Sequence, residues 1–132
     1  WVEDPAHWDA EATTLTATTA DKGYTLDGFK SYVVDGHTAD LIVVLARAPG
    51  SKGTAGLSLF TVKGDAKGLT RRALKTMDET RKLARLDFKG VEATLLGEAG
   101  TAAAPFARTM TEAAVCLANE TVGVAERLRE DA

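Results

Sequence analysis

The sequence predicts a mainly β protein, a small antiparallel β-barrel followed by one long C-terminal helix. Short β-branched or alternating runs, separated by turn residues, fill the chain from about residue 12 to residue 96. Two Asp-Gly pairs, Asp27-Gly28 and Asp35-Gly36, stand close together among these runs. From residue 101 onward the apolar residues recur at helical spacing instead. The expected division is therefore a barrel at 1–99 and the first helix of a second, helical domain at 100–132.

The first predicted strand is the threonine-rich run 13–19, whose alternation suits a half-exposed strand. Asp21-Lys22-Gly23 ends this strand. Residues 24–34 are predicted to form a hairpin around Asp27-Gly28, because this pair suits a two-residue turn in which both residues take positive φ. Asp35-Gly36 is predicted to turn the chain again, close to the next strand.

Four further strands complete the predicted barrel. The run 41–46 is continuous and apolar, which predicts a strand buried on both faces. A strand is also expected at 57–62, after a loop rich in glycine, and segments 69–75 and 84–88 carry weaker strand patterns. Short strands at regular spacing are typical of an antiparallel barrel or sandwich.

The predicted helix spans about residues 101–130. Thr101 is expected to cap it, and Pro105 falls in its first turn, where a missing N–H costs nothing. Its apolar residues form two adjoining faces: Phe106, Met110, Ala113, Leu117, Val124 and Leu128, then Ala114, Ala118, Val122 and Ala125. A helix with so wide an apolar surface needs neighbours on more than one side. We expect it to pack on a second copy of itself or back on the barrel, with Cys116 as a small core residue.

Composition and charge exclude several classes of protein. The 132 residues carry a net charge of −3, so the protein as a whole does not attract nucleic acid or an anionic membrane. Cys116 is the one cysteine, which excludes a disulfide framework and a cysteine-based metal site. No apolar run is long enough for a membrane span, and a cytoplasmic location is expected. The chain starts without methionine and stops inside the predicted helix, so we expect a fragment of a longer polypeptide.

The residues alone predict no reaction. His7 and His37 stand far apart with no carboxylate or cysteine cluster, so no metal site is predicted. Trp1, Trp8 and Tyr32 could stack on a flat ring, although core packing is the commoner role of aromatic residues. The basic run 67–85 could bind phosphates, although a solvated strand face is the preferred explanation. No nucleophile triad, phosphate loop or dinucleotide fingerprint occurs, and no catalytic residue is assigned.

The stretch GYTLDGFKSYVVDGHTADLIVVLAR resembles the middle β-domain of acyl-CoA dehydrogenases. The matching residues are Tyr24, Asp27-Gly28, Lys30, Tyr32, Asp35-Gly36, Ala39-Asp40 and Ala46-Arg47. Upstream, Val2-Glu3-Asp4 stands where the family usually has Thr-Glu-Pro. Downstream, GLSLFTV, KGL, TMDETRKLARLDFKGVEATLLG and ETVGVA follow in the family's order. The resemblance therefore covers nearly the whole chain.

This resemblance implies an FAD-binding wall and names its residues. The positions that touch the flavin in the family correspond here to Trp1, Val2, Glu3, Tyr32, Val33 and Val34. Trp8 stands where many members have a serine that contacts substrate. Tyr32 keeps an aromatic ring where the family has tryptophan, whereas Val2 and Val34 each lack the hydroxyl of the family's threonine. Glu79 and Ala114 fall near positions where the family often has arginine.

The resemblance also implies a reaction that this chain does not complete. In the family, a glutamate removes the α-proton of an acyl-CoA thioester while the flavin takes hydride from the β-carbon. That glutamate lies beyond residue 132 in the family pattern, so the chain is expected to be inactive alone and to hold FAD weakly. The implied partners are acyl-CoA, an electron-transfer flavoprotein and further subunits, with no nucleic acid and no membrane.

Three functions stay open at this point. The parent protein is an active acyl-CoA dehydrogenase, or a non-catalytic partner subunit of one, because several contact residues are changed. The third is an oligonucleotide-binding barrel that uses the basic run 67–85 with Phe29 and Tyr32.

Overall fold

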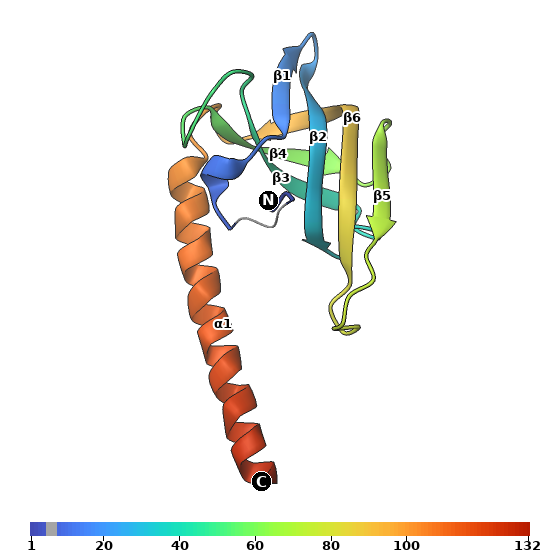
Figure 1. Cartoon of the computed structure of the whole chain (residues 1–132). Helices are drawn as coiled ribbons and strands as arrows, with labels where there is room; N and C mark the ends of the chain where they lie inside the picture. The colour runs from blue at the N-terminus through green and yellow to red at the C-terminus, as the bar shows by residue number, and fades with distance from the viewer. Residues whose placement is uncertain (5–7) are drawn as a thin grey trace.

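A computed structural model describes residues 1–4 and 8–132, and within them it shows six strands and one long helix (Figure 1). The strands are β1 (Thr16–Ala20), β2 (Gly23–Val34), β3 (Leu41–Arg47), β4 (Leu57–Lys63), β5 (Leu69–Ala73) and β6 (Leu83–Leu96). A short 3-10 helix, η1 (Ala10–Ala12), precedes them, and α1 (Ala103–Asp131) follows. The predicted fold class, a small barrel and then a long helix, is confirmed. The two weaker strand predictions are also confirmed, as β5 and as a longer β6.

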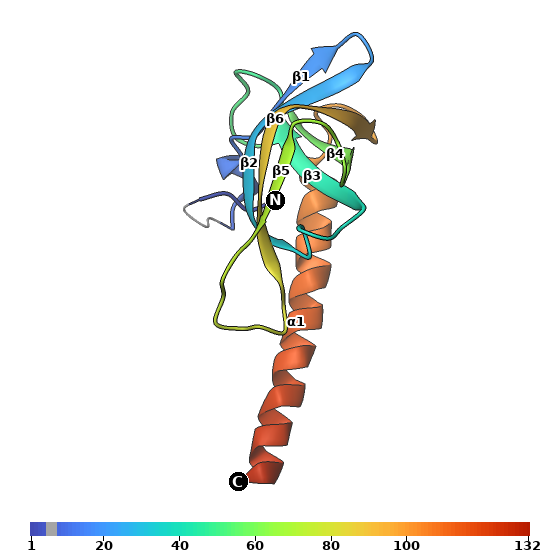
Figure 2. The same cartoon turned by 90° about the vertical axis from the view of Figure 1, so that its right-hand side faces the viewer.

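Five of the strands close into a ring. Their order is β2-β1-β3-β4-β6, and β2 pairs with β6 to complete the circle, while β5 adds to the other edge of β6. All of these pairings are antiparallel except the contact of β1 with β3, where Thr16 lies opposite Arg47. Figure 2 shows the ring from the side, with β5 on its outer flank.

The barrel interior is filled by side chains from every strand of the ring. The largest apolar ones that are fully buried there are Leu15, Leu26, Val44, Phe60, Val62, Leu86, Phe88 and Val91. Full burial of one such side chain contributes roughly 1.5–3 kcal/mol. The barrel therefore has a core of its own, which does not depend on α1.

The prediction that β3 is buried on both faces is wrong for its first half. Leu41 is 61% exposed, and Val43 points outward beside it. Further along the strand, Leu45 is buried on the outer face, because the start of α1 covers it. The residues that make this second cluster are Leu45, Leu57 and Ala102, with Trp1, Ala10, Leu59 and Phe106 packed against them.

The predicted hairpin at Asp27-Gly28 is wrong. β2 runs straight through this pair, and its register against β6 shifts between Leu26 and Gly28, which marks a β-bulge. Gly28 has φ +133°, and Asp27 accepts a hydrogen bond from the Gly90 N–H at 2.8 Å. The two-residue turn lies earlier, between Ala20 and its partner Gly23. Bulges and tight turns share a need for positive φ, so the same residue pair fits both.

The predicted turn at Asp35-Gly36 is present, with Asp35 at φ +50°. It does not make a hairpin, because β2 pairs with β1 and β6 and not with the following strand β3. The turn instead carries the chain across one end of the barrel.

Helix α1 extends away from the barrel (Figures 1 and 2). Pro105 lies in its first turn as predicted, but Thr101 does not cap it: the cap is Ala102, without a side-chain hydrogen bond. None of its residues is buried, so the expectations that it lies back on the barrel and that Cys116 is a core residue are wrong. Away from its first turns, an ion pair between Arg81 and Glu120 links it to the β5–β6 loop. Packing on a second copy stays a prediction.

Gly28→Ala should destabilise the protein by about 2–3 kcal/mol, because positive φ is strained for alanine and space is lacking. A Cβ at Gly28 would meet the Leu15 Cα at 3.2 Å and the Leu15 Cδ1 at 3.0 Å. Gly50→Ala is the matched control, since Gly50 also has positive φ but has no atom within 4 Å of the added Cβ. Urea unfolding of the full-length gene product measures both. Equal losses at the two sites would show that the close approach to Leu15 adds nothing.

Candidate functional site

A buried ion pair joins the start of the chain to β2. Lys30 is only 1% exposed, and its Nζ lies 2.6 Å from the Glu3 Oε1. The same ammonium donates to the Trp1 carbonyl oxygen at 3.1 Å. Taking a lysine out of water costs several kcal/mol unless its charge and its donors find partners. Residues 1–3 supply these partners.

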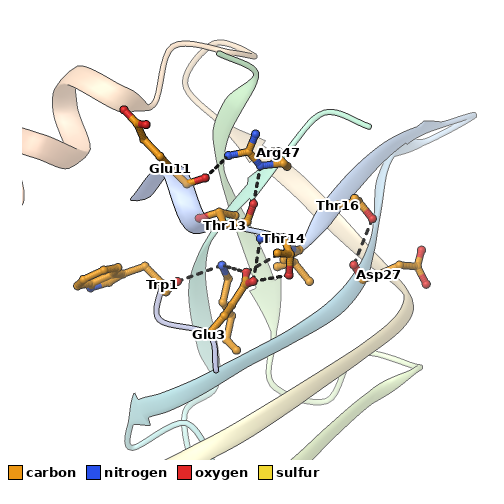
Figure 3. A network of polar contacts seen from close by, with 10 residues as sticks. Trp1, Glu3, Glu11, Thr13, Thr14, Thr16, Asp27 and Arg47 are labelled. Carbon is orange, nitrogen blue, oxygen red and sulfur yellow. Dashed lines mark hydrogen bonds and ion pairs between the residues drawn. The ribbon is translucent and has the colours of Figure 1, made fainter. Parts of the chain in front are cut away.

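Glu3 is satisfied on both of its oxygens (Figure 3). Its Oε2 accepts from the Thr14 N–H at 2.7 Å and from the Thr14 hydroxyl, and its Oε1 accepts from the Leu15 N–H at 3.0 Å. Burial by itself would raise the pKa of Glu3, but the Lys30 charge and these hydrogen bonds outweigh burial and lower it. Burial lowers the pKa of Lys30, and Glu3 opposes this. Hydrogen bonds to both carboxylate oxygens favour the ionised pair at neutral pH.

A second buried cation, Arg47 at the end of β3, anchors the residues just before β1 (Figure 3). Its guanidinium donates only to oxygens, and it forms no ion pair among the residues that the structure describes. The acceptors are the carbonyl oxygens of Glu11, Thr13, Ser51 and Gly53 and the Ser51 hydroxyl. Residues 1–3 and 11–13 are thus held against the barrel by two buried cations.

Tyr32 lies in a bulge of β2 next to this network. The register against β6 shifts between Lys30 and Val33, and Tyr32 has φ +57°, which is uncommon for a bulky residue. The Ser31 N–H donates to the Val2 carbonyl oxygen at 2.9 Å. The Tyr32 side chain is 45% exposed. The bulge therefore presents an aromatic ring on the surface of the barrel.

The ring borders an open hollow of about 250 Å³, which we name the Tyr32 hollow. Its lining residues are Asp4, Ser31, Tyr32, Arg72, Leu74, Lys75, Thr76 and Arg85. Arg85 is engaged by Asp4 at 2.8 Å and by Asp87 at 3.0 Å, and its guanidinium lies 4.0 Å from the centre of the Phe29 ring. Among the described residues, Arg72 and Lys75 form no ion pair. The hollow combines a flat ring with two available positive charges.

The predicted cofactor residues do not all meet at this hollow. Tyr32 and Ser31 line the hollow, and the Ser31 N–H donates to the Val2 carbonyl oxygen. Further along the same strand, Val33 is half-buried and Val34 is exposed. The Trp1 ring instead packs edge-on against Phe106 and against Trp8, with ring centres 5.3 Å apart in both pairs. Trp8, the predicted substrate residue, is thus exposed at the junction of the barrel and α1. Tyr32 joins no aromatic pair of the described residues, so the three rings do not form one stacking wall.

The basic run 67–85 does not form one continuous strip. Arg71 donates to the Ala39 carbonyl oxygen, and Arg81 pairs with Glu120. Lys67 belongs to another open hollow, of about 840 Å³, lined by several lysines and by no aromatic residue. Single-stranded nucleic acid needs aromatic rings that alternate with positive charge along one groove. This arrangement speaks against an oligonucleotide site.

Neither a candidate metal cluster nor a helix that could span a membrane occurs in the part of the chain that the structure describes, residues 1–4 and 8–132. It contains no group of three or more His, Cys, Asp or Glu side chains that could hold a metal ion. His7 lies outside the described residues. No helix in these ranges has both the length and the apolarity to cross a bilayer.

Acid should weaken the folded state through Glu3, and Glu3→Gln should remove that effect. The folded pKa of Glu3 lies below its ordinary value of 4.5, so its contribution to stability is complete above that pH. It is lost as the pH falls from 4.5 through the lowered folded value. Urea unfolding of the full-length gene product at neutral pH and at about pH 3 should therefore show a smaller acid loss in Glu3→Gln than in the wild type. Glu92→Gln, at an exposed strand position, should lose as much free energy of unfolding in acid as the wild type does. If Glu3→Gln also loses as much as the wild type, the assignment of this effect to Glu3 is contradicted.

Comparison with known proteins identifies the fold's relatives. The family model described as "Acyl-CoA dehydrogenase, middle domain" matches residues 3–91. The short-chain specific acyl-CoA dehydrogenase of Megasphaera elsdenii is 30% identical over 98% of this chain. The chain spans about a third of that relative, 36% of its length.

Solved structures agree with this match. The butyryl-CoA dehydrogenase of Megasphaera elsdenii has a TM-score of 0.68 and 32% identity, over 75% of this chain and 27% of that one. The prolyl acyl carrier protein oxidase AnaB has a TM-score of 0.72 and 29% identity, over 80% of this chain and 29% of that one. The family model and the relatives show that this chain belongs to the acyl-CoA dehydrogenase family, with the family's middle domain at residues 3–91.

Proposed function

We propose that this chain forms one wall of the FAD and substrate site of a dehydrogenase that oxidises acyl-CoA thioesters between the α- and β-carbons. The single observation that carries the proposal is the Tyr32 ring, held outward by a bulge beside a cationic hollow. By its resemblance to the family, Tyr32 stands where the family usually has a tryptophan that contacts the flavin. The family itself is established, and the cofactor and the reaction are the proposal.

The described residues suit one wall of a flavin site. Tyr32 offers a ring face, and Arg72 and Lys75 offer charge for an anionic cofactor or substrate. The backbone of Val2 and Glu3, next to Ser31, is proposed to face the polar edge of the flavin. Ligand pockets usually measure about 300–1,000 Å³. The Tyr32 hollow is smaller, about 250 Å³, so the proposal assigns the remaining walls to parts of the protein outside this chain.

FAD, when bound, would supply the hydride acceptor of the reaction, and the role of this chain is to orient it and exclude water. Asp4 is the one carboxylate on the Tyr32 hollow in the described residues, and it is paired with Arg85. It is therefore a poor candidate for the base that removes the α-proton, which we assign to a part of the protein outside this chain. Trp8 would border the acyl thioester at the junction with α1. Acyl-CoA, an electron-transfer flavoprotein and further subunits are the proposed partners.

A non-catalytic partner subunit is the second candidate. It is favoured by Val2 and Val34, which lack the hydroxyl donors of the family, and by the exposed Trp8 in a substrate position. The two functions differ in one observable. An active dehydrogenase loses its visible flavin absorption when acyl-CoA is added without oxygen, and a non-catalytic subunit does not.

Tyr32→Leu should weaken FAD binding by roughly 5- to 10-fold, because an aromatic contact contributes about 1 kcal/mol beyond its buried area. Tyr32→Trp restores the family's ring and should bind FAD at least as well as the wild type. Titration of the deflavinated full-length gene product, followed by flavin fluorescence, measures both. Equal affinities of the Leu and Trp variants would place the flavin away from Tyr32.

A further inference from the structure

The bulge in β2 has no hydrogen-bonding partner in β6, and residues 1–4 provide one. We name these residues the N-terminal segment. β6 pairs with Lys30 and resumes with Val33, so neither Ser31 nor Tyr32 has a register partner in it. The Ser31 N–H donates instead to the Val2 carbonyl oxygen at 2.9 Å. The N-terminal segment thus takes the place of a neighbouring strand at the residue before Tyr32.

The N-terminal segment is neither helix nor strand, so its position depends on side-chain contacts. Lys30 holds it at two points, the Trp1 carbonyl oxygen at 3.1 Å and the Glu3 carboxylate at 2.6 Å. Glu3 is fixed in turn by the Thr14 and Leu15 N–H groups at 2.7 and 3.0 Å. Three successive residues, 1 to 3, are therefore tied to Lys30 and Ser31, immediately before Tyr32.

The conformation of Tyr32 needs such support. A bulky residue at φ +57° is strained, and the strain persists only where the surroundings impose it. The side chain itself is half-exposed and enters no aromatic pair of the described residues, so its own packing supplies little of that support. Support comes from the backbone on both sides: the ladder to β6 resumes at Val33, and the Ser31 N–H bonds to Val2 just before Tyr32.

We propose that Glu3 and Lys30 are positioning residues: they hold the N-terminal segment on the bulge and thereby fix the Tyr32 ring at the edge of its hollow. Both side chains are buried and neither lines the hollow, so they act on it only through Tyr32. The role of the ring toward FAD rests on the proposed function, whereas the coupling of the pair to Tyr32 does not.

The test uses fluorine NMR of the full-length gene product with 3-fluorotyrosine, in which Tyr32→Phe assigns the Tyr32 signal. Lys30→Met and Glu3→Gln break the pair, and each should move the Tyr32 signal toward its denatured position. Val91→Ala is the matched control, because it damages the barrel core without touching the N-terminal segment, and it should leave the signal in place. Tyr24, the second tyrosine of this chain, serves as an internal reference in the core. A Tyr32 signal that stays in place in both folded variants, or that moves as far in Val91→Ala, overturns the proposal.

A milder variant covers the case in which breaking the pair prevents folding. Thr14→Val removes one hydroxyl donor to Glu3 at an exposed position and keeps both charges. It should move the Tyr32 signal in the same direction by a smaller amount. No movement in Thr14→Val, with the stronger variants unfolded, overturns the proposal as well.

FAD titration of the same variants separates this inference from the proposed function. Lys30→Met should lower FAD affinity about tenfold while Val91→Ala leaves it near the wild-type value. If the Tyr32 signal moves but the wild type binds no FAD, the positioning role stands and the proposed function fails. If the wild type binds FAD and Lys30→Met changes neither the signal nor the affinity, the proposed function stands and the positioning role fails.

Discussion

The conformation of the bulge at Tyr32, and of the irregular residues around it, depends on the ion pair between Glu3 and Lys30. A lysine that is 1% exposed is tolerable only because a carboxylate and a carbonyl oxygen meet it inside the protein. Those acceptors come from residues 1–3, and the carboxylate is held by the first residues leading into β1. One interaction therefore joins three parts of the chain that have no strand pairing with one another at this point. The surface that Tyr32 presents follows from it.

Arg47 extends the same physical principle to the next residues. Its guanidinium satisfies carbonyl oxygens before β1 and in the β3–β4 loop, which otherwise would need water. Irregular backbone can pack against the barrel at this end because two buried cations supply its hydrogen bonds. The outer face of β3 is covered by Phe106 and Ala102 near the same place, so the start of α1 is anchored to the barrel while the rest of the helix extends away.

Most strands could be located from alternating or apolar runs, and the barrel followed from their spacing, although β5 carries little such pattern and β2 was expected to be a hairpin. The role of Asp27-Gly28 could not be predicted, since a bulge and a hairpin turn require the same backbone freedom. Lys30 looks solvent-exposed in sequence, and its partner Glu3 lies 27 residues away, so no local pattern reveals a buried pair. The resemblance to the family identified Tyr32 and Glu3 as candidate cofactor-contacting residues. It did not show that the Glu3 side chain points inward, because this depends on tertiary contacts alone.

A double-mutant cycle tests most directly whether Glu3 and Lys30 act as one unit. Urea unfolding would be measured for the wild type, Glu3→Gln, Lys30→Met and the double variant of the full-length gene product. Each single change should cost about 3–5 kcal/mol, because it leaves a buried group without its partner. The double variant should cost less than the two losses together by about 1–3 kcal/mol. Losses that add to within about 0.5 kcal/mol would show that the two residues are independent and would contradict this central role.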